Sequence, residues 1–170
     1  MGNSPMTSGS ETMPPSSPVC AAGAGDDAYM HRAATDEVLE LLNVLLAAER
    51  AGTRVARESR RDCATAEQRA LLARILADEA NWCRVLSTAI AALGGTPTGE
   101  TGDFYRRAMA IGDLAERLRF LNRGQGWVAK RLGTMIPRLP EGELRGQLIA
   151  MRENHRANIA HVNDFLAGSV

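Results

Sequence analysis

Apolar side chains recur every three or four residues along most of the chain, the spacing that places them on one face of an α-helix. Helix-ending signals separate these stretches: the Gly94-Gly95 pair is followed by Pro97, and Gly112-Asp113 and Pro137 interrupt the later ones. The pattern predicts four long helices and one short helix, over Thr35–Arg60, Thr65–Leu93, Asp103–Ile111, Asp113–Ile136 and Glu141–Leu166.

The four long helices form two pairs, each joined by a short turn. We therefore expect two antiparallel hairpins that pack as an all-α four-helix bundle over residues 34–168. The connection from Gly94 to Gly112, with its short helix, is long enough to cross the bundle, although a simple up-and-down order is the alternative. Residues 1–33 are rich in serine, proline and glycine, and we expect them to form a disordered arm.

Polar residues interrupt the apolar stripes of three predicted helices near their centres: Glu49, Glu79 and His155. A buried carboxylate or imidazole is costly unless it is paired, hydrogen-bonded or bound to a metal. Glu49 and Glu79 are almost equally far from the first turn, and Gln125 and His155 from the last one. Because a helix rises about 1.5 Å per residue, each pair lies at one level. The four residues form one layer if the hairpins pack at a common height.

Carboxylates and an imidazole in one buried layer are a ligand set that suits iron, manganese or zinc. We expect Glu49, Glu79 and His155 to be the metal ligands. A thiolate one turn away would favour zinc or copper(I). The side chains expected to surround and orient the ligands are Cys83, Asn122, Gln125 and Arg152.

The same residues also allow a purely structural interpretation. In that alternative, Arg152 pairs with Glu49 or Glu79, and His155 forms a hydrogen bond with Gln125. Such a network fixes the register of the helices without any reactivity.

The composition limits the classes of binding partner that we expect. Twenty basic residues balance twenty acidic ones, so we expect neither nucleic acid nor an anionic membrane as a partner. No apolar run approaches the roughly 18 residues of a membrane span. The N-terminus lacks a basic start and apolar core, and the three cysteines lack the spacing of a disulfide framework. We expect a cytoplasmic homo-oligomer, with a dimer favoured.

Three segments are similar to those of a known superfamily. The phrase Leu93-Gly94-Gly95-Thr96-Pro97 closes the second helix, and Asp78-Glu79-Ala80-Asn81-Trp82-Cys83 and Phe120-Leu121-Asn122-Arg123-Gly124-Gln125-Gly126-Trp127 lie on the second and third long helices. Over Thr35–Leu166 the chain resembles the ferritin-like superfamily, which includes rubrerythrins and bacterioferritins, and within it an uncharacterised bacterial branch. The resemblance implies a ferritin-like four-helix bundle.

Di-iron members of that superfamily use six ligand positions, a glutamate on each helix and two histidines. Three of these positions keep a ligand here, and they are Glu49, Glu79 and His155. The other three hold Trp82 for a histidine, and Gln125 and Arg152 for glutamates. The resemblance therefore implies either an altered, mononuclear metal site in place of a di-iron centre or a relic fold that holds no metal.

The sequence supports three hypotheses about function, and it does not decide whether the protein is an enzyme. The first is metal handling or redox chemistry at an altered metal site in the core. The second is a non-enzymatic bundle that acts through oligomerisation or a protein partner. The third is a thiol-dependent site at Cys83 beside Glu79, which both the carboxylate and burial disfavour.

Overall fold

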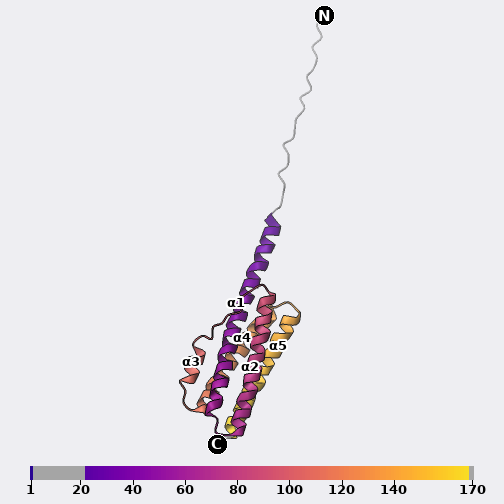
Figure 1. Ribbon diagram of the computed structural model, residues 1–170. Helices are drawn as coiled ribbons and strands as arrows, with labels where there is room; N and C mark the ends of the chain where they lie inside the picture. Colours follow the sequence, from indigo (N-terminus) through magenta and orange to yellow (C-terminus); the bar gives the residue numbers. More distant parts are fainter. Residues whose placement is uncertain (2–21, 169–170) are drawn as a thin grey trace. The chain divides into compact units, whose positions relative to one another are not determined.

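The computed structural model describes Met1 and residues 22–168, with side chains from Thr35 onward besides that of Met1. In this part of the chain every regular element is helical and no strand occurs. The all-α prediction is thereby confirmed. The elements are α1 (Ala22–Ser59), α2 (Ala66–Ala92), α3 (Phe104–Met109), α4 (Leu114–Met135) and α5 (Glu143–Ala167), with 3₁₀ turns at Arg60–Asp62 and Ile136–Arg138 (Figure 1).

The first helix begins at Ala22, well before its predicted start at Thr35. The chain divides into a unit Met1–Ala34 and a unit Thr35–Val170. Residues 2–21 of the predicted arm lie outside the described residues, whereas residues 22–33 are helical. The disorder of the arm therefore stays a prediction. Two glycines in this stretch each cost about 1 kcal/mol relative to alanine. Extending an existing helix nevertheless avoids the cost of nucleating one.

Local capping chemistry sets the ends of the later helices. Thr65 accepts a hydrogen bond from the N–H of Gln68, whose side chain accepts one from the N–H of Thr65, as the Thr65–Gln68 spacing predicts for a capping box. Asp113 caps α4 in the same way, by accepting from the N–H of Glu116 at 2.8 Å. Gly94 ends α2 with a φ of 80°, a left-handed conformation that favours glycine.

The connection between α2 and α4 runs along α1 and crosses the length of the helices. Near its start, Asn43 of α1 accepts a hydrogen bond from the N–H of Thr98 at 2.8 Å. Farther on, the hydroxyl of Tyr105 in α3 donates to Glu58, close to the end of α1, at 2.6 Å. Helix α4 therefore starts at the same end as α2 and runs in the same direction, while α5 returns beside it (Figure 1). This is the crossing connection, and not the up-and-down order.

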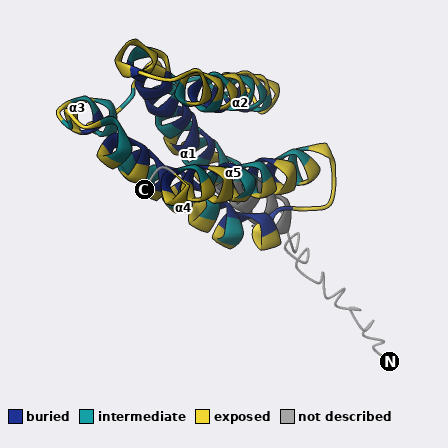
Figure 2. Ribbon diagram, turned by 90° about the horizontal axis from the view of Figure 1, so that it is seen from below, coloured by how far each residue is buried: buried dark blue, intermediate teal, exposed yellow. Residues whose placement is uncertain are grey.

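Buried residues lie on the faces that the long helices turn toward one another (Figure 2). They form two apolar clusters. The Leu45 cluster comprises Leu42, Leu45, Leu46, Trp82, Leu86, Ile90, Val128, Leu132, Met135, Ile136, Leu139, Leu148 and Met151. The Ile75 cluster comprises Val55, Ala56, Cys63, Leu72, Ile75, Ala108, Leu118, Leu121, Val162 and Leu166. Each large side chain among them stabilises the fold by about 1.5–3 kcal/mol on burial.

A polar layer separates these two clusters. On each of the four long helices, one layer residue lies between a member of the Leu45 cluster and a member of the Ile75 cluster along the sequence. The layer residues are Glu49, Glu79, Gln125 and His155, and all four are buried.

Arg117 fixes the start of α4 against the turn between α1 and α2. Its guanidinium is almost fully buried, donates to the carbonyl of Ile111 at 2.6 Å and to the hydroxyl of Ser59 at 3.2 Å, and forms an ion pair with Asp62. The side chain of Arg117 thus joins the turn between α1 and α2, the connection between α2 and α4, and the start of α4 itself.

Replacing Arg117 by methionine should therefore destabilise the protein far more than replacing the exposed Arg119 on the same helix. We expect Arg117→Met to lower the free energy of unfolding by about 2–4 kcal/mol, because the carbonyl and hydroxyl lose a buried charged donor. For Arg119→Met we expect a change within about 0.5 kcal/mol. Urea unfolding of both variants measures the difference, and equal midpoints would refute the role of Arg117.

Candidate metal centre

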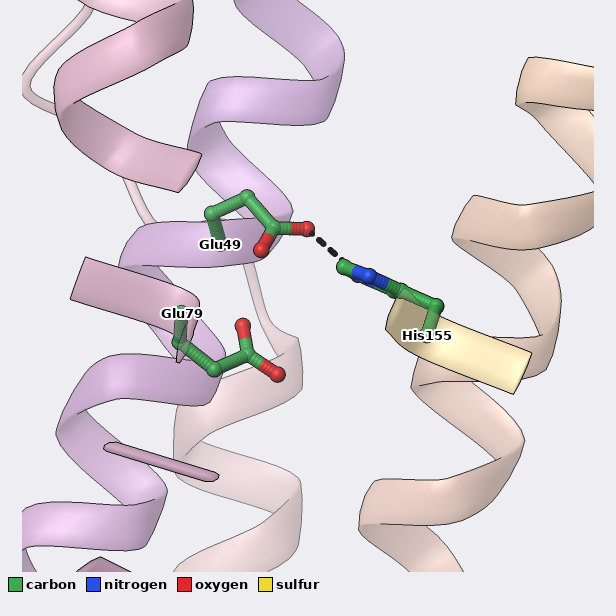
Figure 3. Close-up of side chains that lie close together, drawn as sticks. All are labelled: Glu49, Glu79 and His155. Carbon is green, nitrogen blue, oxygen red and sulfur yellow. Dashed lines mark hydrogen bonds and ion pairs between the residues drawn. The ribbon is translucent and has the colours of Figure 1, made fainter. Parts of the chain in front are cut away.

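Glu49 of α1, Glu79 of α2 and His155 of α5 point toward one another in the core (Figure 3). One ligand atom from each lies within 4.8 Å of those of the other two. Their exposed fractions are 1%, 3% and 2%. The Nε2 atom of His155 lies 3.0 Å from Oε1 of Glu49. The fold thus brings together the three residues that the sequence singles out, while their role as metal ligands stays a prediction.

The backbone of α5 assigns the tautomer of His155. Its Nδ1 lies 3.1 Å from the carbonyl oxygen of Met151. Because a carbonyl oxygen only accepts, Nδ1 carries the hydrogen. Burial lowers the pKa of His155, so the ring is held neutral. The lone pair on Nε2 then faces Glu49, where it can accept a proton from the carboxyl group or bind a metal ion.

Two neighbours shape the surroundings of Glu79. The side-chain amide of Gln125 donates to its Oε1 at 3.2 Å. Gly52, nearly one turn after Glu49 on α1, leaves room for the carboxyl group, because a Cβ at this position would stand only 2.7 Å from Cδ of Glu79. This role of Gly52 was not predicted from the sequence, where its signal is a glycine within the apolar stripe of the first helix.

Burial changes the acidity of both carboxyl groups. It raises the pKa of Glu49 from 4.5 to about 8, although a hydrogen bond with Glu79 opposes the rise. Burial also raises the pKa of Glu79 well above its usual range, and the nearby charge of Glu49 adds to that increase. Among residues 35–168, no ion pair joins either carboxyl group to an arginine or lysine. Protons therefore neutralise the pair in the absence of another cation.

The donor set fits a metal ion. Buried Oε2 of Glu49 and Oε1 of Gln125 have no hydrogen-bond partner in the described part of the chain. An ion that holds oxygen and nitrogen ligands at about 2.0–2.2 Å keeps opposite ligand atoms no more than about 4.4 Å apart. The observed limit of 4.8 Å is only slightly wider. Small side-chain rotations would therefore bring the three residues into coordination distance.

Two of the side chains that the sequence predicts around the layer form their hydrogen bonds outside it. Arg152 donates to Glu153 at 3.1 Å, so its predicted pairing with Glu49 or Glu79 is wrong. Asn122 donates to the carbonyl of Ile159 at 3.1 Å and thereby ties α4 to α5 beyond the layer. The predicted contact of Asn122 with the ligands is therefore wrong too.

His155 also departs from the predicted network, because it contacts Glu49 instead of Gln125. The observed layer therefore joins Glu49 with His155 and Glu79 with Gln125, and a hydrogen bond between the two carboxyl groups links these pairs. Neither pair contains an arginine.

Cys83 lies beside the layer as a protonated thiol. Its Sγ atom is 3.7 Å from the hydroxyl of Thr53. Burial raises the pKa of Cys83 to about 11, and the charges of Glu49 and Glu79 act in the same direction. Since the thiolate is the reactive and metal-binding form, this environment disfavours the thiol-dependent hypothesis.

The two tryptophans have different surroundings. Trp82 is buried and donates to Asn154 at 2.7 Å. Asn154 in turn donates to Asp78 at 3.2 Å, so this polar chain links α2 to α5. Trp127, in contrast, has an exposed fraction of 41% and lines a cavity.

This cavity, of about 450 Å³, opens beside the layer between α1, α4 and the segment 101–107. Glu49, Glu79 and Gln125 contribute its buried polar lining. This cavity was not predicted from the sequence. Its signal was the mid-helix Gly124, where a Cβ would stand 2.6 Å from the ring of Phe104.

The chain matches a known family over most of its length. Residues 36–164 match the family described as Domain of unknown function (DUF6306). Since the match covers most of the chain, the protein belongs to this family. Neither the curated proteins nor the solved structures contain a match to the chain.

Residues 22–168 contain no helix that is both long enough and apolar enough to span a membrane.

The buried carboxyl groups predict a pH dependence of stability in the metal-free protein. Between pH 4.5 and about 8, folded Glu49 keeps a proton that the unfolded chain has lost, so the free energy of unfolding falls as the pH rises. His155 opposes this trend only below about pH 6.5, where the unfolded chain takes up a proton. The fall should therefore be clearest from pH 6.5 to 8, at up to about 1.4 kcal/mol per pH unit for each such carboxyl group.

Urea unfolding in EDTA at several pH values measures this slope. We expect Glu49→Gln to flatten it and the exposed Glu40→Gln on the same helix to leave it unchanged. Identical slopes in the parent and in Glu49→Gln would show that Glu49 does not hold the proton.

Proposed function

We propose that this protein is a ferritin-like four-helix bundle that binds one divalent metal ion through Glu49, Glu79 and His155, for metal handling or redox chemistry. The observation that carries the proposal is two buried carboxyl groups beside a neutral imidazole, with no arginine or lysine of residues 35–168 paired to them. A divalent cation would neutralise both carboxylates and take the Nε2 lone pair that faces Glu49. It would also bind Oε2 of Glu49, which has no hydrogen-bond partner among the described residues.

The helix order supports the ferritin-like part of the proposal. Bundles of that class contain one long crossover connection, and their metal sites lie between facing helices. Here the connection between α2 and α4 crosses along α1, and the three candidate ligands come from three different helices. The layer lies midway between the two apolar clusters, which is where such a site is expected.

The ligand set limits the chemistry. Two carboxylates and one imidazole suit iron, manganese or zinc, and three protein ligands leave coordination positions free. Trp82, Gln125 and Arg152 occupy the positions where the superfamily carries further ligands, so a single ion is the occupancy that this chain supports. Gln125 would orient Glu79 through its amide.

Elemental analysis after loading and desalting tests this assignment. We expect the parent to retain iron, manganese or zinc at one ion per chain, and Glu49→Ala, Glu79→Ala and His155→Ala each to lose it. The exposed residues Glu40 and His161 provide matched controls, because Glu40→Ala and His161→Ala should retain the metal. If the parent retains no metal and the three core variants only change stability, the layer is a structural network.

Metal affinity should rise with pH. Because the pKa of Glu49 is about 8, a divalent ion must displace its proton at lower pH. We expect the apparent affinity to increase about tenfold per pH unit for each displaced proton between pH 6 and 8. Competition with a chelator of known pH dependence gives the slope. An affinity that is independent of pH would show that metal binding displaces no proton from Glu49 or Glu79, and would contradict the proposed site.

A further inference from the structure

The cavity beside the layer has the size and lining of a site for a small organic molecule. Its volume of about 450 Å³ lies within the range of about 300–1,000 Å³ that is usual for ligand pockets. Small side chains of α1 and α4, including Ala47, Ala48 and Gly124, leave this space. Its lining is largely apolar, with a few polar and charged side chains among it.

At the inner end, the polar group that requires a partner is Gln125. Its exposed fraction is 3%, and its amide nitrogen is used by Glu79. Gln125 lines the cavity, and its buried Oε1 has no hydrogen-bond partner among the described residues. An amide oxygen only accepts, so its complement is a hydrogen-bond donor such as a hydroxyl group. A buried acceptor left without one costs about 1–3 kcal/mol.

At the outer end, aromatic rings and arginines surround the opening. The rings of Phe104 and Phe120 stack with centroids 4.8 Å apart. The guanidinium groups of Arg107 and Arg123 lie 5.3 Å and 5.1 Å from the centroid of Phe120. Flat rings favour an aromatic ligand, and guanidinium groups favour a carboxylate.

One acidic residue also lines the opening. Asp103 forms an ion pair with Arg106 at 2.9 Å, which offsets its charge. The charge left at this end is therefore that of Arg107 and Arg123, which is positive.

We propose that this cavity binds a hydroxylated aromatic carboxylic acid, with its hydroxyl group on Gln125 and its carboxylate at Arg107 and Arg123. The aromatic body lies between the small residues of α1 and α4. This site goes beyond the metal proposal and does not depend on a bound ion, because Gln125 and the two arginines are not metal ligands.

Isothermal titration calorimetry with para-hydroxybenzoate, para-hydroxycinnamate and para-hydroxybiphenylcarboxylate tests the proposal on the full chain, with EDTA and with loaded metal. We expect at least one of the three to bind in both conditions. The matching acid without the hydroxyl group should bind about three- to tenfold more weakly, the value of one hydrogen bond. The matching phenol without the carboxylate should also bind more weakly.

Variants locate the site. Arg123→Gln should weaken binding of the acid about tenfold, as expected for a charge-assisted contact, whereas Arg119→Gln, on the same helix but outside the cavity, should not. Ala47→Phe should abolish binding by filling the cavity, and Ala80→Phe on the exposed face of α2 should leave it intact. Circular dichroism checks that each variant is folded.

Two results would overturn the inference. One is the absence of binding by all three hydroxy acids at millimolar concentration. The other is binding that neither Arg123→Gln nor Ala47→Phe changes, which would place the ligand elsewhere. Metal retention is measured separately, so a protein that binds metal but no acid refutes only this inference, and one that binds acid but no metal refutes only the metal proposal.

Discussion

The structure depends on one constraint, the burial of two carboxyl groups and an imidazole between two apolar clusters. Glu49, Glu79 and His155 are almost fully removed from water and lie between two clusters of apolar side chains. Apolar residues at these three positions would be less costly to bury. Replacing buried polar groups by apolar ones of similar volume is often neutral or stabilising. The stability of the fold therefore does not account for this layer. Protonation and the contacts with Gln125 and the carbonyl of Met151 make its burial tolerable, as the raised pKa of Glu49 reflects.

The crossing connection makes the two sides of the layer different. On one side, α5 closes the layer with His155, whose tautomer is set by its own backbone. On the other side, the segment 101–107 lies over small residues of α1 and α4 and leaves the cavity open. The connection can take this path because Asn43 holds its start, Glu58 holds α3 and Arg117 holds its end. The carboxyl groups thus have α5 and His155 on one side and the cavity on the other.

Helix geometry explains how much of this could be predicted. Because the rise per residue is fixed, distances from the turns were enough to place Glu49, Glu79, Gln125 and His155 in one layer. The predictions from the sequence were wrong where the structure depends on the direction of a side chain or on contacts between residues far apart in the chain. Arg152 lies one turn from His155 but reaches outward to Glu153, and no periodicity encodes that choice. The cavity was missed because it depends on how the connection packs against Gly124, a contact between residues far apart in sequence. The early start of α1 was missed because local glycine propensity was given more weight than helix extension.

Gln125 joins the two proposed sites. Its amide nitrogen donates to Glu79, and the residue lines the cavity, where we propose that its oxygen accepts from the ligand hydroxyl. A metal ion that displaces the proton of Glu79 would turn this contact into a charge-assisted hydrogen bond, which is roughly twice as strong as a neutral one. The amide would then be held more rigidly, with its oxygen presented to the cavity. A ligand hydroxyl on that oxygen would polarise the amide in the same sense and strengthen its bond to Glu79. By linkage, each ligand must then raise the affinity for the other by the same factor. A carboxyl group at this position would carry its own negative charge toward the ion, whereas the neutral amide transmits the interaction without competing for the metal.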